Sequence, residues 1–354
     1  MNERPRLLIT MGDVAGIGPE IIAKAWSKLN DFCRPVVVGD PDWMRRALKL
    51  ANAIDSTAAV REIRDPGEGE PNFQTIPCMS ATDQNLHQVE PGRVSAAAGK
   101  AAYDFLCKAI DLTLAGAADG IVTAPLHKEG LRAAGLRYPG HTEILAERTG
   151  TSRFAMMLYA SFLSPRTAVR GLGVAHVTLH MALRDIFQHL TRGAIWEKIR
   201  LLDQVLVQLL PRTPAGVAAK QKNSRPRIGV AGLNPHAGDG GLFGDEEAGI
   251  IRPAVEAALE NGLNVSGPWP SDTLFVRAMD GEFDGLVVMY HDQGHIALKL
   301  LGGRRAVNIS AGLPIVRTSV AHGTAYDIAG KGVADESSLI EAARVATKLV
   351  MSEK

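Results

Sequence analysis

The chain has 354 residues, 46% of them hydrophobic and 22% charged, and its 39 basic and 38 acidic side chains leave a formal net charge of +1. This balance is ordinary for a globular protein and includes no basic block, which argues against nucleic acid or an anionic membrane as the main partner. No apolar run approaches the roughly 18 residues of a membrane span, and the length is sufficient for two α/β domains.

Short β-branched runs alternate with longer amphipathic segments, a pattern typical of βα units and a largely parallel sheet. The runs predict strands at 6–10, 35–39, 120–124, 168–178, 227–233, 285–291 and 305–310. The periodic segments between them predict helices at 19–29, 42–53, 93–116, 141–149, 182–208, 245–260, 271–279 and 335–351. Residues 64–91 are expected to form an irregular connection, and residues 211–226 a flexible surface excursion. The predicted fold class is therefore α/β.

The first strand leads into a glycine-rich sequence, MGDVAGIGPEI, at residues 11–21. Gly16 and Gly18 match the first two glycines of the dinucleotide-binding fingerprint, and Asp40 follows the second strand as the fingerprint requires. The third glycine position carries Ile21, however, although close packing of helix on strand needs a small residue there. We therefore interpret this stretch as a strand-to-helix turn, with the proline and glutamate that follow beginning the helix.

Polar side chains gather where the later strands end. The four stretches are TAPLHKEG, HVTLHMALRD, NPHAGDGGLFGDE and YHDQGHIALK. Because ligands of open α/β sheets bind at the carboxyl ends of the strands, these stretches predict one composite site.

Three of the ten histidines, His180, His236 and His291, follow separate strand ends. Distant imidazoles that converge in a folded cleft are the usual form of a catalytic metal site with an open position, and nitrogen ligands favour Zn²⁺, Mn²⁺, Co²⁺ or Fe²⁺ over Mg²⁺. Each could instead be an ordinary surface or core histidine. The other histidines are expected to be structural, except that His127 and His295 could contact the metal ligands without binding the metal themselves.

A second group of residues suits an anion. His141 and Thr142 stand at an expected helix start, where free backbone donors favour negative charge, although Thr142 could be only a helix cap. Lys299, Asn308 and Arg317 add two cations and an amide in an apolar region, which suggests a phosphate or carboxylate pocket. The alternative for each cation is a solvated charge on a surface.

Six motifs, taken in chain order, resemble the 4-hydroxythreonine-4-phosphate dehydrogenase family of pyridoxal phosphate biosynthesis, which includes paralogues that act on four-carbon sugar-acid phosphates. They are MGDVAGIGPEI, TAPLHKEGL, YPGHTE, GLNPHAGDGG, YHDQGH and GLPIVRTSVAHGTAYDIAGKG, and the match runs from about residue 7 to residue 345. The resemblance implies a dehydrogenase that uses NAD and a divalent metal (Zn, Mn, Co or Mg). It also implies the two-domain α/β/α fold of isocitrate and isopropylmalate dehydrogenases, which bind NAD without a Rossmann fingerprint.

The resemblance assigns roles to individual residues. Family metal ligands fall on His180, His236 and His291. Substrate contacts fall on His141, Thr142, Lys299, Asn308 and Arg317. The strand ends and the anion-binding pattern select the same residues independently. Proton transfer is expected from Lys299 or Asp292, and the sequence does not choose between them.

The resemblance further implies a homodimer whose active site lies in the interdomain cleft at the dimer interface. We expect a first α/β domain formed by residues 1–127 and 295–354. The second, residues 128–294, would carry most metal ligands and the dimer interface. The three scattered cysteines, without metal-type pairing, and the absence of a signal-peptide pattern favour a reducing cytoplasmic location.

Some positions depart from the family pattern. Val14 stands where many members have proline, and Ala321 where aspartate is usual. The sequences HVTLHMALRD and HDQGHIALKLL are closer to the paralogues than to the biosynthetic enzyme. A dihydrodiol dehydrogenase branch shares HVTLH and HDQGHI but lacks GHTE and RTSV. The presence of His141, Thr142 and Arg317 therefore favours a phosphorylated acid of the 4-phosphoerythronate or 4-phosphothreonate type, oxidised to a keto acid with decarboxylation.

Three alternatives remain open at this point. One is a dihydrodiol dehydrogenase of an aromatic-degradation pathway. Another is a metal-dependent hydrolase or aldolase that uses the same three histidines with a bound water. The third is a non-catalytic binding protein, which the retention of a complete ligand set disfavours.

Overall fold

The computed structural model describes residues 4–51, 58–70, 72–162, 170–210 and 225–353. The chain forms two compact units, unit 1 with residues 1–154 and 313–354 and unit 2 with residues 155–312. The sequence placed these boundaries after residues 127 and 294. They lie later because the two short helices after residue 127 pack beside a long helix of unit 1, whereas the strand after residue 306 pairs within unit 2.

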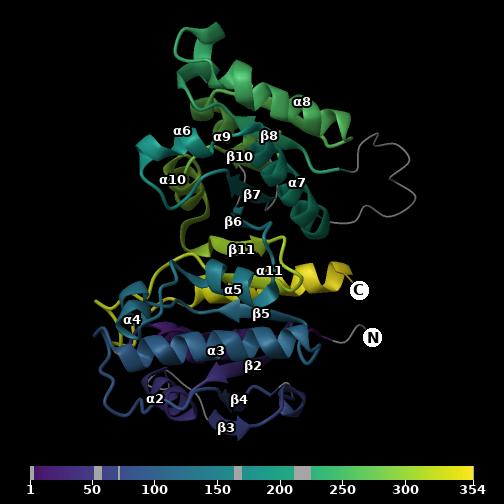
Figure 1. The fold of residues 1–354 in the computed structure, drawn as a ribbon. Coiled ribbons are helices and arrows are strands. Elements are labelled where there is room, and N and C mark those ends of the chain that lie inside the picture. Colours follow the sequence, from purple (N-terminus) through teal and green to yellow (C-terminus); the bar gives the residue numbers. More distant parts are fainter. Residues whose placement is uncertain (1–3, 52–57, 71, 163–169, 211–224, 354) are drawn as a thin grey trace, which may run out of the picture. The chain divides into compact units, whose positions relative to one another are not determined.

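Unit 1 contains a parallel sheet with helices packed on it (Figure 1). Its strands, in the spatial order β3-β4-β2-β1-β5-β12, are β3 (Ala59–Ile63), β4 (Thr75–Ser80), β2 (Arg34–Gly39), β1 (Arg6–Thr10), β5 (Gly120–Thr123) and β12 (Val316–Val320). Its helices are α1 (Gly18–Leu29), α2 (Pro41–Ala51), α3 (Ala96–Leu114), α4 (Lys128–Ala133), α5 (His141–Thr149) and α11 (Ser337–Glu353). The long helix α3 lies against β1, β2 and β5, and α4 and α5 pack against α3.

The glycines after β1 are explained by packing inside unit 1. A Cβ on Gly16 would lie 2.8 Å from the Thr324 carbonyl oxygen, and a Cβ on Gly18 would lie 2.2 Å from the Met11 carbonyl oxygen. Ile21 is fully buried at the third fingerprint position. The stretch is therefore a tightly packed strand-to-helix turn, as predicted.

Unit 2 contains a mixed sheet. Its strands, in the spatial order β11-β6-β7-β10-β8-β9, are β11 (Val307–Ala311), β6 (Ala155–Phe162), β7 (Arg170–His176), β10 (Gly285–Val288), β8 (Ile228–Ala231) and β9 (Val265–Trp269). Strand β6 runs antiparallel to both neighbours, and the remaining described pairs are parallel. The helices are α6 (Ile186–His189), α7 (Arg192–Leu209), α8 (Arg252–Glu260), α9 (Ser271–Met279) and α10 (His291–Gly302). Helix α7 packs on β7 and β10, and α10 packs on β6 and β7 (Figure 1).

The α/β fold class is confirmed, and each predicted strand corresponds to an observed one. The expected irregular connection at 64–91 was wrong, because it contains β4, whose proline and cysteine hide its strand pattern. The single helix expected at 182–208 was also wrong, because Thr191 caps a new helix, α7, by accepting a hydrogen bond from the Ala194 amide. Most of the excursion predicted at 211–226 lies outside the described residues.

Other elements were not predicted at all. They are β3, β6, β9, β12, α4 and α10. All three cysteines are free and buried. Within the described ranges, no helix combines the length and the apolar character needed to cross a membrane.

Candidate active site

Four histidines of unit 2 come together where β7 and β10 end. His176 is the last residue of β7, His180 lies in the loop after it, and His291 and His295 occupy the first two turns of α10. The ring centroids of His180 and His291 are 5.8 Å apart, and those of His176 and His295 are 4.6 Å apart. The rings of His291 and His295 stack at 3.7 Å with an angle of 12° between their planes. Two of the three predicted metal ligands therefore lie side by side.

Asp292 orients the imidazole ring of its neighbour His291. The Nδ1 atom of His291 lies 2.7 Å from Oδ1 of Asp292. A carboxylate at this distance accepts the Nδ1 proton of a neutral imidazole, which leaves the lone pair on Nε2 available for a ligand. This is the arrangement expected of a metal-binding histidine.

His176 and His295 form a buried pair behind His291. Nδ1 of His295 lies 3.0 Å from Nε2 of His176 and 3.2 Å from the carbonyl oxygen of His291. Burial, followed by the neighbouring histidines, holds the pKa of His176 well below its ordinary value, and the same causes lower the pKa of His295 to about 4. Both rings are therefore neutral at pH 7 and provide an uncharged support for His291.

The third predicted ligand, His236, stands on a loop with unusual backbone geometry. His236, Ala237 and Asp239 have φ values of 55°, 55° and 45°, within the left-handed region. Each non-glycine residue in this region costs roughly 1–2 kcal/mol, so the loop is held by its surroundings. The His236 ring is exposed and lies against Phe243, with centroids 6.3 Å apart.

Glu247 anchors the start of this loop. Its carboxylate is buried and accepts hydrogen bonds from the backbone amides of Leu233 and Asn234, both at 2.7 Å, and from the Asn234 side chain at 3.0 Å. Burial alone would raise the pKa of Glu247, but these hydrogen bonds outweigh it and lower the pKa below its ordinary value. Glu247 is therefore ionised at neutral pH.

Two further side chains tie the strand ends together. Gln293 donates through Nε2 to the Gly232 carbonyl and to Ser271 Oγ, both at 2.7 Å, and accepts from the Met289 amide at 2.6 Å. Thr178 donates through Oγ1 to the Met289 carbonyl at 2.7 Å. The loops after β7, β8 and β10, which carry the three predicted ligands, are thus linked by hydrogen bonds. Sequence reasoning missed Thr178, Glu247 and Gln293, although the first and last lie two residues from predicted ligands.

The fit of a metal rests on the donors themselves. In the part of the chain that the structure describes, no three His, Cys, Asp or Glu side chains are arranged to hold an ion. His180 and His236 are exposed, and His291 is already oriented by Asp292. An all-imidazole set of this kind suits Zn²⁺, Mn²⁺ or Co²⁺, so the residues present fit the predicted group.

Part of the predicted anion-binding group comes together in unit 1. Arg317, on β12, is only 3% exposed and donates through Nη2 to Oγ1 of Thr123 at 2.6 Å. Burial lowers the pKa of Arg317 to about 9, which still leaves it charged at neutral pH. Burial and then the charge of Arg317 hold the pKa of His141 well below its ordinary value. A neutral imidazole and a buried guanidinium are thus near neighbours.

The other predicted substrate residues are spread over both units. Thr142 is the second residue of α5, and the helix cap is Gly140, so Thr142 is not the cap considered above. Lys299 is exposed on α10 and Asn308 lies on β11, both in unit 2. His141, Thr142 and Arg317 belong to unit 1.

A buried carboxyl group links the first glycine-rich motif to the last one. Asp13 accepts hydrogen bonds from the Tyr326 hydroxyl at 2.8 Å and from the Ala15 amide at 2.9 Å. The Tyr326 ring stacks on His127 with centroids 4.4 Å apart. Burial raises the pKa of Asp13 above its ordinary value. This interaction connects residues more than three hundred positions apart, and nothing in the local sequence signals it.

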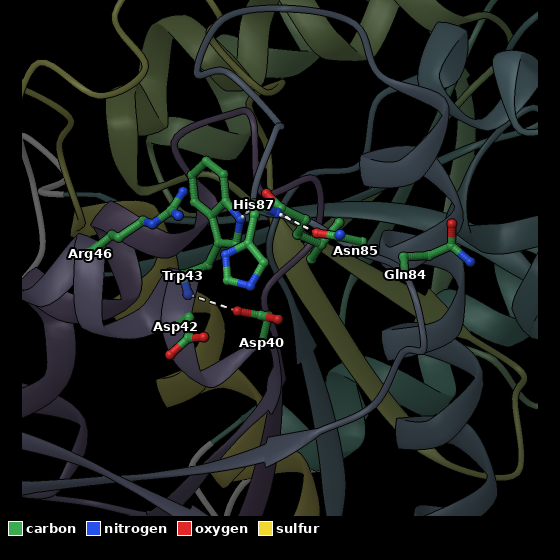
Figure 2. Close-up of a pocket in the computed structure, with 8 residues that line it drawn as sticks. Asp40, Asp42, Trp43, Arg46, Gln84, Asn85 and His87 are labelled. Atoms are coloured by element: carbon green, nitrogen blue, oxygen red, sulfur yellow. Dashed lines mark hydrogen bonds between the residues drawn. The ribbon is translucent and has the colours of Figure 1, made fainter.

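A polar pocket of unit 1 lies at the end of β2, where the dinucleotide fingerprint would need its acidic residue (Figure 2). Its volume is about 240 Å³, and it is lined by Asp40, Asp42, Trp43, Arg46, Gln84, Asn85, Leu86 and His87. Asp40 accepts a hydrogen bond from the Trp43 amide at 2.8 Å, and Asn85 accepts one from the His87 amide at 3.1 Å. Asp40 is therefore engaged at the start of α2, and none of the predicted site residues lines the pocket.

Comparison with known proteins identifies close relatives of the whole chain. Residues 31–346 match the family model described as pyridoxal phosphate biosynthetic protein PdxA. A 4-hydroxythreonine-4-phosphate dehydrogenase from Beijerinckia indica subsp. indica is 46% identical, over 97% of this chain and 94% of its own. A D-threonate 4-phosphate dehydrogenase from Cupriavidus necator is also 46% identical, over 98% and 97%. The crystal structure of a 4-hydroxythreonine-4-phosphate dehydrogenase from Klebsiella pneumoniae is 41% identical and superposes with a TM-score of 0.81, over 98% of this chain and 99% of that one.

Proposed function

This chain belongs to the pyridoxal phosphate biosynthetic protein PdxA family, and from that premise we propose that it oxidises a phosphorylated four-carbon hydroxy acid with NAD and a divalent metal. It is an oxidoreductase that acts on a CH–OH group. The secondary alcohol loses a hydride to NAD⁺ and a proton to the medium, which gives a ketone. Where the carboxylate is β to that ketone, the carboxylate leaves as CO₂ and a proton takes its place on carbon.

The buried guanidinium of Arg317 is the observation that carries the choice of a phosphorylated substrate. A guanidinium donor that is charged at neutral pH, beside a neutral histidine and a threonine hydroxyl, forms a compact receptor for a phosphate group. Thr142 is the second residue of α5 in the same unit, and the backbone amides without helical partners at this helix start add further donors. A dihydrodiol carries no phosphate for this receptor to bind, which disfavours the dihydrodiol alternative.

Among phosphorylated acids, we favour 4-phosphothreonate or 4-phosphoerythronate over 4-hydroxythreonine 4-phosphate. Relatives of both kinds are equally similar to the chain, so identity alone does not decide. The sequences HVTLH and HDQGH, which resemble the sugar-acid paralogues, contain His176 and His295. These two side chains form the neutral pair behind His291, so the difference lies directly beside a proposed metal ligand.

Side chains of this protein are assigned to metal binding and to proton transfer. When bound, a divalent cation supplies Lewis-acid polarisation of the substrate hydroxyl, and the nicotinamide supplies the hydride acceptor. His180, His236 and His291 would hold the cation, with Asp292 orienting the His291 ring through its Nδ1 atom. Because Asp292 is engaged with His291, the side-chain amine of Lys299 is the better candidate to accept the hydroxyl proton.

We also propose that the protein is a homodimer that associates through unit 2. Large apolar side chains are exposed on the segment that follows β7 and includes α6, on the His236 loop and on α10. They are Met181, Leu183, Phe187, Leu242, Phe243, Ile296 and Leu300. Large exposed apolar side chains near a polar site are a feature of protein–protein interfaces.

The function is tested with metal-stripped protein and a panel of phosphorylated and unphosphorylated four-carbon acids, with NADH formation followed at 340 nm. Activity should be absent after chelation and return with Zn²⁺, Mn²⁺ or Co²⁺. The variant Arg317→Ala should raise KM for the phosphorylated acid by about 100-fold, with much less effect on its unphosphorylated analogue, since a charge-assisted pair is removed. Full turnover by metal-free protein, or an unchanged KM in Arg317→Ala, would contradict the proposal. Turnover of a dihydrodiol but of no phosphorylated acid would favour the alternative.

A further inference from the structure

The loop that carries His236 follows an unusual path that its own sequence does not stabilise. Left-handed backbone runs from His236 to Gly240, with φ values of 55°, 55°, 82°, 45° and 68°. Three of these five residues are not glycine, so their Cβ atoms oppose the conformation. The amides of Ala237 and Phe243 donate to the carbonyls of Asn234 and Gly238 within the loop, and a contact outside the turn adds to these bonds.

Glu247 provides that contact at the entrance to the turn. Its Oε1 atom accepts the amides of both Leu233 and Asn234, the residues that lead from β8 into the turn, and its Oε2 atom accepts the Asn234 side chain. Charged acceptors make the stronger hydrogen bonds, and this one is buried, where competition from water is small. The two amides are thereby fixed in direction before the chain turns left-handed.

The glycines of the loop leave room for this carboxylate. A Cβ on Gly232 would lie 3.1 Å from Oε1 of Glu247, and a Cβ on Gly238 would lie 2.8 Å from Oε2. Glu247 itself begins a single π-helical turn, Glu247–Ile251, that continues into α8. The carboxylate is therefore enclosed by the loop on one side and held by a helix on the other.

We propose that Glu247 is a positioning residue that holds the left-handed loop so that His236 is presented to the metal. The inference rests on the proposed function, because it takes His236 to be a ligand. Its consequence is that metal affinity depends on the distance of the carboxylate from the amides of Leu233 and Asn234. It does not depend on the negative charge alone.

Two variants separate geometry from charge. Glu247→Gln keeps the length of the side chain and removes the charge, whereas Glu247→Asp keeps the charge and withdraws it by one methylene from both amides. Glu256→Gln, at an exposed position of α8, removes the same charge without touching the loop and serves as the control. Mn²⁺ affinity is measured by titration calorimetry on the metal-stripped protein, and amide hydrogen exchange is followed in peptides that cover residues 233–244.

We expect both Glu247 variants to raise Kd for Mn²⁺ about tenfold or more, and to speed exchange in the loop at least tenfold, with the control within twofold. Wild-type affinity in Glu247→Asp together with weak binding in Glu247→Gln would show a role for charge alone and overturn the inference. Faster exchange with unchanged Kd would overturn it as well. If the wild-type protein binds no Mn²⁺, Zn²⁺ or Co²⁺, the proposed metal site itself fails, which is a distinct result.

Discussion

Replacing Gly294 with alanine tests the packing that supports the histidine cluster. Gly294 lies in the first turns of α10, three residues after His291. A Cβ at this position would lie 2.5 Å from Nε2 of His176 and 2.9 Å from the side chains of Val174 and Val288. All three neighbours belong to β7 or β10 or to their ends and are almost completely buried, so none can turn into solvent.

The cost follows from this geometry. Ordinary contact begins near 3.4 Å, so the contact with His176 is too short by 3.4 − 2.5 = 0.9 Å and the helix or the ring must move. Overpacking of this kind costs up to about 3 kcal/mol, and the better helix propensity of alanine returns about 1 kcal/mol. We expect a net loss of about 2 kcal/mol, which lowers the midpoint of thermal unfolding by roughly 4–8 °C for a unit of this size. The displaced atom, Nε2 of His176, also loses its hydrogen bond to His295.

Thermal unfolding followed by circular dichroism measures the effect. The matched control is Gly193→Ala on α7, where a Cβ would meet nothing within 4 Å, so alanine should be neutral or stabilise by up to about 1 kcal/mol. The two variants should therefore unfold at clearly different temperatures. If Gly294→Ala were as stable as Gly193→Ala, α10 would not be packed on β7 as described, and the support inferred for His291 would be lost.

Three more outcomes are expected. Asp292→Asn should weaken Mn²⁺ binding about tenfold in a chelator competition, because the partner of His291 loses its charge, and unchanged affinity would contradict this orientation. Burial raises the pKa of Asp13, so the wild type should lose stability relative to Asp13→Asn as pH rises above 3.8 in urea titrations, whereas a pH-independent difference would refute that shift. Leu300, which is 80% exposed, should support dimerisation, so Leu300→Glu should sediment as a monomer if the wild type is a dimer, and an unaltered dimer would exclude α10 from the interface.

The sequence predicted the pairing of His180 with His291 because that pairing depends only on topology. Both residues follow strands that end on the same side of one sheet, and adjacent parallel strands, β7 and β10, bring their exits together. His141 and Arg317 were selected on other grounds, an expected helix start and a cation in an apolar region, since β12 itself was not predicted. The positions of residues that depend only on strand order can therefore be predicted from the sequence.

The contacts that depend on the path of a loop could not be predicted from the sequence. The strand predicted at 285–291 ends at Val288 in the structure, because Met289 donates to the side chain of Gln293 and the chain turns into α10. The apolar run itself contains no stop signal. Glu247 was not singled out in the sequence, since its hydrogen bonds to Leu233 and Asn234 accompany a left-handed turn that the sequence does not specify.

Two glycine-rich stretches of this chain look alike in sequence and are explained in the same way by the structure. In MGDVAGIGPEI, the space that a Cβ would need at Gly16 and Gly18 is occupied by carbonyl oxygens of the protein itself. In GLNPHAGDGG, the corresponding space is occupied at Gly238 by the carboxylate of Glu247 and at Gly232 by Ala237 together with that carboxylate. Glycine in a strand exit therefore does not by itself indicate that a phosphate approaches the backbone. The group that occupies the space of the absent side chain must be identified first. In both stretches this group belongs to the protein chain itself.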